Sequence, residues 1–207
     1  MLYYVTFIPT IIVAITCHEF AHAWLALKFG DDTAQRQGRV SLNPLAHLDP
    51  IGFLGIVLVG FGWGRPVPVT ASRLRHPRAD LLVSAAGPGM NLLLAAMAGG
   101  ILRIPGVVDG LMAAGLWSGA AVLIPVFVQI NVMLALFNIL PFYPLDGSHM
   151  VQHLLPVRLA ARFNTFNQRY GYMMLMGLIL SSYLLPISPL SLLLGPPLDF
   201  FTSLFLS

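Results

Sequence analysis

The stretch LYYVTFIPTIIVAITCHEFAHAWLALKF, residues 2–29, indicates the class of fold. It is apolar over most of its length, and a helix of about 20 apolar residues, each rising about 1.5 Å, crosses the hydrocarbon core of a bilayer. The ionisable residues His18, Glu19 and His22 lie inside it, well before Lys28 at its end. Such side chains are costly in lipid and are found there with partners. The stretch therefore predicts a transmembrane helix that carries a polar site.

The spacing of these three residues indicates that their partner is a metal ion. On an α-helix His18 and His22 lie on one face, so both imidazoles can reach one metal ion, with Glu19 about 100° around the helix. This pattern is typical of zinc metalloproteases, in which the histidines hold Zn²⁺ and the glutamate accepts a proton from water that the metal has made more acidic. Glu19 is the only glutamate in the sequence, so such a motif is expected by chance about once in a thousand chains of this composition. The alternative is a histidine pair that only stabilises the fold.

The composition independently predicts a membrane protein. Apolar residues make up 57% of the chain and charged residues 9%, with a mean hydropathy of +0.80, whereas soluble domains carry about 25% charged residues. The basic residues that give the net charge of +3 lie in loops that flank the apolar stretches, which predicts no nucleic-acid partner. We expect residues 1–207 to form a single membrane-embedded metalloprotease domain in the lipid bilayer.

The order of apolar stretches predicts an all-α polytopic membrane protein with about four transmembrane helices plus a re-entrant or interfacial element that includes a short β segment. The expected spans are residues 2–29, 79–101, 118–140 and 170–194, the last of which Pro186 and Pro189 can divide. Residues 51–63 are apolar but too few to cross a bilayer. They are expected to be the re-entrant part of an element over residues 51–70, and residues 65–70 its extended part, which could pair with a substrate segment.

The distribution of basic residues predicts the orientation. Ten of the eleven arginines and lysines lie in or beside the segments between spans one and two and between spans three and four, and only Arg103 lies between spans two and three. By the positive-inside rule, the protein lies in the cell membrane with both termini extracytoplasmic. The histidine motif then lies nearer the cytoplasmic end of the first span.

A catalytic zinc needs a third protein ligand and an open position for water. Asp146 is the best candidate, because it follows a proline-broken helix end at the same predicted depth as the histidine motif. His149, one helical turn further on, is its main rival. The three ligand types do not by themselves distinguish Zn²⁺ from Co²⁺ or Fe²⁺. We predict one Zn²⁺ per chain.

Three motifs together resemble the site-2 protease family of intramembrane zinc metalloproteases. They are HEFAH at residues 18–22, GPGMN at residues 87–91, and NILPFYPLDG at residues 138–147. The resemblance is to the compact form without a PDZ or CBS domain, and it implies cleavage of transmembrane protein substrates in regulated intramembrane proteolysis. It implies these site residues: zinc ligands His18, His22 and Asp146, general base Glu19, and substrate-facing Asn138 and Asn91.

Two other functions fit parts of the pattern. A metal transporter also places histidine and aspartate in its spans, but it usually needs further ligands along its path, and spans two and four offer only Asn91. A relative that has lost its activity would keep the fold, yet zinc binding alone would not require Glu19. The sequence leaves the substrate, the cleavage site and the oligomeric state open.

Overall fold

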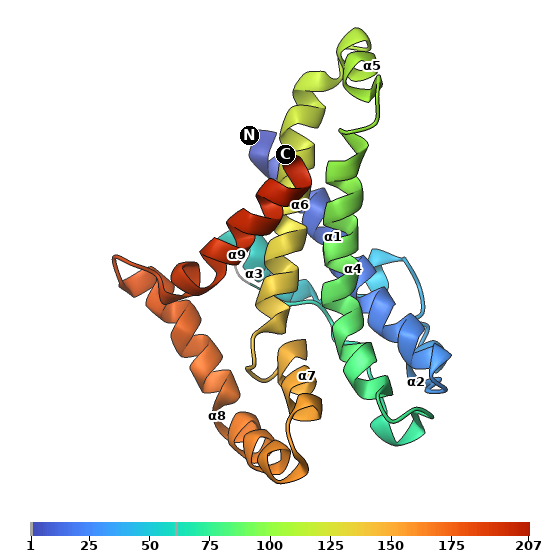
Figure 1. Cartoon of the computed structure of the whole chain (residues 1–207), viewed down its shortest axis with the longest axis vertical. Coiled ribbons are helices and arrows are strands. Elements are labelled where there is room, and N and C mark those ends of the chain that lie inside the picture. The colour runs from blue at the N-terminus through green and yellow to red at the C-terminus, as the bar shows by residue number, and fades with distance from the viewer. Residues whose placement is uncertain (1, 61) are drawn as a thin grey trace.

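Three long helices form the centre of the molecule: α1 (Leu2–Lys28), α4 (Ala79–Ile101) and α6 (Trp117–Ile139). The computed structural model describes residues 2–60 and 62–207, with the side chains described from Val5 onward. Helix α4 packs against both α1 and α6, and Figure 1 shows α4 and α6 running along each other with α1 behind them. Small side chains such as those of Ala14 and Ala95 are fully buried there, which allows the helix backbones to approach closely.

The other elements connect or surround these three helices. They are α2 (Thr33–Arg36), α3 (Pro50–Val59), α5 (Val107–Ala113), α7 (Asp146–Leu154), α8 (Val157–Leu184), α9 (Pro189–Leu206) and the 3₁₀ turns Pro44–Ala46 and Ala71–Arg73. Helix α9 packs on α6 and α4, and Leu198 closes a core cluster with Ala95, Val128 and Val132. Figure 1 shows α8 standing away from the three central helices.

Four helices in the described part of the chain are long and apolar enough to cross a membrane: Val5–Lys28 of α1, α4, α6 and α9. This confirms the predicted all-α polytopic membrane fold. The predicted spans 2–29, 79–101 and 118–140 agree with the bounds of α1, α4 and α6 to within one residue. Hydropathy averaged over a long window therefore predicts the bounds of these three helices.

The fourth predicted span, residues 170–194, is wrong in its bounds. Helix α8 begins at Val157, ends at Leu184 and contains three arginines, and it is not among the helices apolar enough to span. A new helix, α9, begins at Pro189, where the Ser188 side chain accepts a hydrogen bond from the Ser191 N–H. The two prolines break the apolar stretch, because Pro186 has no N–H and Pro189 favours a first helical turn. The candidate span is α9, most of which lies beyond the predicted one.

The element predicted over residues 51–70 is only partly correct. Helix α3 begins after Asp49, whose side chain accepts hydrogen bonds from the N–H groups of Ile51 and Gly52, and it ends at Gly60 in the left-handed conformation. Beyond it, the described residues form no strand, and a single antiparallel bridge joins Leu48 to Gly64. The expected β segment fails because Pro66 and Pro68 cannot donate to a ladder.

Candidate metal centre

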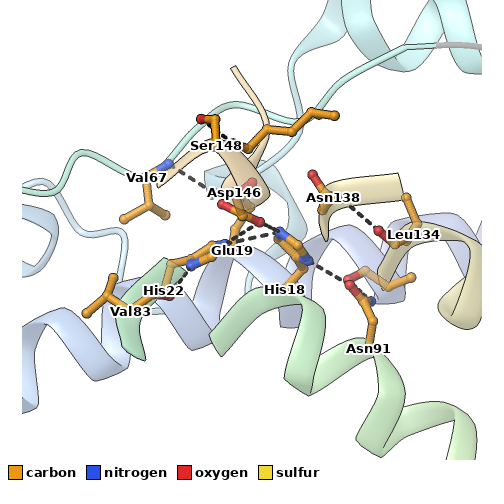
Figure 2. A network of polar contacts seen from close by, with 12 residues as sticks. His18, Glu19, His22, Val67, Val83, Asn91, Leu134, Asn138, Asp146 and Ser148 are labelled. Atoms are coloured by element: carbon orange, nitrogen blue, oxygen red, sulfur yellow. Dashed lines mark hydrogen bonds and ion pairs between the residues drawn. The ribbon is translucent and has the colours of Figure 1, made fainter. Parts of the chain in front are cut away.

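Helix α1 places two ring nitrogens against each other inside the helix bundle. His18 and His22, four residues apart, are each 7% exposed, and their Nε2 atoms lie 3.1 Å apart. Figure 2 shows both rings turned toward the same point, with α4 packed close beside them. The one-face arrangement predicted from the spacing is therefore present in the structure.

The turn between α6 and α7 brings a carboxylate to the same point. The Oδ2 atom of Asp146 lies 3.1 Å from the Nε2 atom of His18 and 3.3 Å from that of His22. The approach depends on Gly147, because a Cβ atom there would lie 2.0 Å from the carbonyl oxygen of Ile139. His149, the rival to Asp146, is exposed and lies outside the cluster of possible metal ligands in the described residues.

Hydrogen bonds at the far side of each ring fix which nitrogen carries the proton. The Nδ1 atom of His22 lies 2.7 Å from the carbonyl oxygen of Val83, which can only accept, so Nδ1 is the donor. The Nδ1 atom of His18 lies 2.6 Å from Oδ1 of Asn91. In a neutral imidazole with a proton on Nδ1, Nε2 has a free lone pair.

The orientation of the Asn91 amide follows from a chain of acceptors. Its Nδ2 atom donates to the carbonyl oxygen of Ala14 at 3.1 Å and to Oδ1 of Asn131 at 2.9 Å. Asn131 in turn donates from Nδ2 to the carbonyl oxygen of Phe127 at 2.9 Å. Because the chain ends at backbone carbonyls, the oxygen of Asn91 faces His18 and accepts its proton. Helices α4 and α6 thus set the tautomer of a residue on α1.

The three atoms that meet at the centre of the cluster are therefore all acceptors. They are the two Nε2 lone pairs and Oδ2 of Asp146, which is buried and has no hydrogen-bond donor in the described residues. Buried acceptors that face one another without a donor are unfavourable unless a cation lies between them. Two imidazoles and one carboxylate are a donor set that Zn²⁺ takes, with one coordination position left open.

Gly87 on α4 supplies the space beside the ring nitrogens. A Cβ atom at this position would lie 2.3 Å from Nε2 of His22 and 2.5 Å from Nε2 of His18. The side chain of any other residue would press against the two nitrogen atoms that would hold a metal. The residues present therefore fit a metal ion of the size of zinc.

Glu19 lies at the edge of the cluster and is partly exposed. Its Oε2 atom accepts a hydrogen bond from the backbone N–H of Val67 at 3.0 Å. Figure 2 shows the carboxylate beside Asp146 and His22, with the chain of Val67 crossing next to it. The geometry allows one carboxylate oxygen to remain free for exchange of a proton at the cluster.

The two asparagines predicted to face the substrate lie in different surroundings. Asn138, near the end of α6, is partly exposed, and its Nδ2 atom donates to the carbonyl oxygen of Leu134 at 2.9 Å. Asn91 is fully buried and occupied by His18, Ala14 and Asn131. Its predicted place in a substrate-facing wall does not agree with this geometry, because no part of the side chain reaches a surface.

Comparison with known proteins identifies relatives of this chain. The model of peptidase family M50 matches residues 99–178, which include Asp146. A Bacillus subtilis protein named "putative zinc metalloprotease YwhC" is 43% identical over 180 residues, covering 85% of this chain and 82% of its own length. The chain belongs to peptidase family M50. This confirms the resemblance to site-2 proteases and makes the chain a zinc metalloprotease at the level of family.

More distant relatives have the same description. A Mycolicibacterium smegmatis protein, Rip2, with the same description as YwhC, is 34% identical over 151 residues, 70% of this chain and 56% of its own length. Rip2 of Mycobacterium tuberculosis H37Rv is 32% identical over 151 residues and the same shares of both chains. The chain thus spans little more than half of the Rip2 proteins. No solved structure matches it.

Proposed function

We propose that the chain is an intramembrane zinc metalloprotease that hydrolyses peptide bonds within or near transmembrane segments of membrane-protein substrates, as a step of regulated intramembrane proteolysis. The supporting observation is that three acceptor atoms meet beside the carboxylate of Glu19: two from His18 and His22, on a helix apolar enough to span the membrane, and one from Asp146. The chain acts as one membrane-embedded domain, and its substrate is another membrane protein.

In this proposal one zinc ion is held by His18, His22 and Asp146. When bound, zinc would acidify a water molecule and polarise the carbonyl group of the scissile peptide bond. Asn91 orients His18, a role that replaces the one first expected for it. Partners of this kind keep a ligand in the correct tautomer.

Glu19 performs the proton transfers. Its carboxylate accepts a proton from the attacking water and gives it to the leaving amide nitrogen, so that the new amine departs uncharged. Asn138 has a second N–H besides the one bonded to Leu134. That N–H can donate to the oxygen on which negative charge develops, provided the substrate carbonyl lies within about 3 Å.

The membrane setting explains why the substrate must change conformation. In an intact helix the peptide groups are engaged in intrahelical hydrogen bonds and are shielded by side chains, so a scissile bond is open to attack only after local unwinding. Unwound backbone is tolerated at this depth when it lies against protein or water. The described part of the site is such a place, because the Glu19 carboxylate is partly exposed.

We place both termini outside and the metal cluster nearer the cytoplasmic face. The support is the distribution of arginine and lysine in the sequence, with Arg103 alone on the other side. To test it, single cysteines replace Arg36 and Asp109 in a Cys17→Ser background, and whole cells are treated with a membrane-impermeant maleimide. Labelling of Asp109→Cys and protection of Arg36→Cys is expected, and the reverse pattern would invert the topology.

Cleavage by the purified protein tests the activity. Wild type and Glu19→Gln are incubated in detergent with a panel of single-span substrates, and bound zinc is measured in both. We expect stoichiometric zinc in both proteins and cleavage within the span by wild type alone. Asp109→Asn, a carboxylate remote from the cluster, is the control and should cleave like wild type. Absence of zinc from wild type after reconstitution, or cleavage by Glu19→Gln, would contradict the proposal.

A further inference from the structure

The extended chain from Gly64 to Thr70 runs along the C-terminal half of α1, and three of its five backbone N–H groups donate to other parts of the protein. The N–H of Arg65 donates to the carbonyl oxygen of His47 at 2.7 Å, and that of Thr70 donates to Oδ2 of Asp31 at 2.6 Å. Between them, the Val67 N–H donates to Glu19. A segment that pairs with a substrate strand needs free N–H groups along one edge. This segment is therefore poorly suited to the substrate pairing that its extended sequence had suggested.

The residues on either side make the Val67 N–H a defined single donor. Pro66 and Pro68 have no N–H, so Val67 supplies the only backbone donor of residues 66–68. Each proline fixes its own φ, and Pro68 also restricts Val67 to extended backbone. A short run with this composition has little freedom to turn its one donor elsewhere.

The segment is held in place from its other side by a buried arginine. Arg39 is 4% exposed, and its Nη2 atom donates to the carbonyl oxygen of Arg65 at 2.5 Å. Leu48 and Gly64 form the isolated bridge immediately before it. Hydrogen bonds therefore hold the segment at Arg65, and the bond from Thr70 to Asp31 holds its other end. The backbone between these two points keeps the Val67 N–H beside Glu19.

We propose that the Val67 N–H is a positioning group for the general base. It fixes Oε2 of Glu19 and leaves Oε1 for the proton of the attacking water. This rests on the proposed function, since it assigns a catalytic task to Glu19. The segment Pro66–Pro68 acts on the enzyme's own carboxylate.

The contact itself can be tested without a substrate. In full-length protein in detergent, labelling with ¹³C-carbonyl proline and ¹⁵N-valine gives signals only from the four Pro–Val peptide bonds, at residues 66–67, 68–69, 125–126 and 156–157. The Val67 signal is the one lost in Val67→Pro. We expect its amide proton to exchange at least about ten times more slowly in wild type than in Glu19→Ala, because a hydrogen-bonded amide is protected. Equal exchange rates in the two proteins would overturn the proposal.

Kinetics with the single-span substrates that wild type cleaves test the consequence. Val67→Pro removes the donor, and Val69→Pro, also preceded by proline, removes an N–H that is not bonded to Glu19. We expect kcat to fall by about 10- to 100-fold in Val67→Pro, with KM and bound zinc unchanged, because small errors in the position of a catalytic group have effects of this size. Val69→Pro should behave like wild type.

The outcomes separate this inference from the proposed function. A rise in KM at constant kcat in Val67→Pro would mean that the segment binds substrate, and it would overturn the positioning role. If wild type with zinc cleaves no substrate while the Val67 amide is protected, the protease assignment fails although the contact exists. If Val67→Pro loses its zinc or melts early, the exchange comparison between wild type and Glu19→Ala decides alone.

Discussion

Two carboxylates with buried oxygen atoms, those of Asp31 and Asp146, lie in opposite situations. Asp31, just beyond the end of α1, is fully buried, and its oxygens accept from the Thr33 N–H at 3.0 Å, the Thr33 hydroxyl at 2.5 Å and the Thr70 N–H at 2.6 Å. Asp146 has a buried oxygen without any donor in the described residues, and the nearest polar atoms are the ring nitrogens of His18 and His22. One carboxylate has its partners within the chain, and the other lacks them.

The difference separates a structural group from a candidate metal ligand. Burial by itself raises the pKa of Asp31, but hydrogen bonds from Thr33 and Thr70 lower it below the usual value. A satisfied carboxylate of this kind stabilises the loops that it joins. Asp146 faces lone pairs, so the fold gains nothing from it until a cation is bound. Changing each carboxylate should therefore affect a different property.

The largest effect is expected at Asp146. In Asp146→Asn, zinc affinity should fall by more than about 100-fold, since loss even of an outer partner of a ligand costs about 10- to 100-fold. The melting temperature of the metal-free protein should stay the same or rise, because three facing acceptors become two. Zinc titration and thermal unfolding in detergent measure both. A large loss of stability in the metal-free variant would mean that Asp146 is structural, like Asp31.

The next effect concerns the space between the rings. Gly87→Ala places a Cβ atom against the Nε2 atoms of His18 and His22, which would hold the metal, so bound zinc should be lost. Gly89→Ala is the matched control, because it makes the same change in the same helix and its Cβ atom would meet nothing within 4 Å. Gly89→Ala should be at least as stable as wild type, since alanine favours helix over glycine by about 1 kcal/mol. Gly87→Ala must displace the two buried rings, so it should unfold at a lower temperature than Gly89→Ala. Normal zinc in Gly87→Ala would place the metal elsewhere.

A smaller effect on zinc is expected from the hydrogen-bond chain behind His18. Asn91→Leu removes the acceptor of the His18 proton, and zinc affinity should fall by about 10- to 100-fold. Asn91→Asp keeps an acceptor at that place and should bind zinc more tightly than Asn91→Leu does. Isothermal titration of the metal-free proteins gives both affinities. Equal losses in the two variants would show that Asn91 acts through packing alone.

The smallest effect on zinc, and a clear effect on stability, is expected at Asp31. Asp31→Asn should lower the free energy of unfolding at neutral pH by about 1.5–3 kcal/mol, the contribution of hydrogen bonds to a charged group, with bound zinc unchanged. Because the folded-state pKa is lowered, this stabilisation is present above about pH 4 and is lost as the pH falls further. Unfolding curves at pH 7 and pH 3 measure the difference in free energy of unfolding between Asp31→Asn and wild type, which should be smaller at pH 3.

Asp32→Asn is the control for this prediction. Asp32 lies next to Asp31 but forms exposed ion pairs with Arg36 and Arg73. Such pairs contribute about 0–1 kcal/mol. If Asp31→Asn changed zinc binding, or if Asp32→Asn destabilised the protein equally, the distinction between the satisfied and the unsatisfied carboxylate would fail.

Much of the fold could be predicted from the sequence because its signals are local. Hydropathy over about 20 residues predicted α1, α4 and α6, and the spacing of His18 and His22 predicted that they share a helix face. The hydropathy average failed after residue 170, where an apolar stretch continues through a proline-containing break between α8 and α9. Average hydropathy does not register that a proline lacks a backbone N–H. The prolines between α8 and α9 therefore set the ends of these helices, although the hydropathy stays high.

The sequence by itself determined three of the membrane helices and the shared helix face of His18 and His22, and it predicted Asp146 as their partner, because these depend on periodicity, hydropathy and the needs of a metal. Only the tertiary structure decided the role of Asn91, the space at Gly87 and the donor at Val67. His18 and Asn91 are 73 residues apart in the sequence, and Glu19 and Val67 are 48 apart. Hydrogen bonds between such distant groups arise only when helices and loops pack, so no local pattern records them.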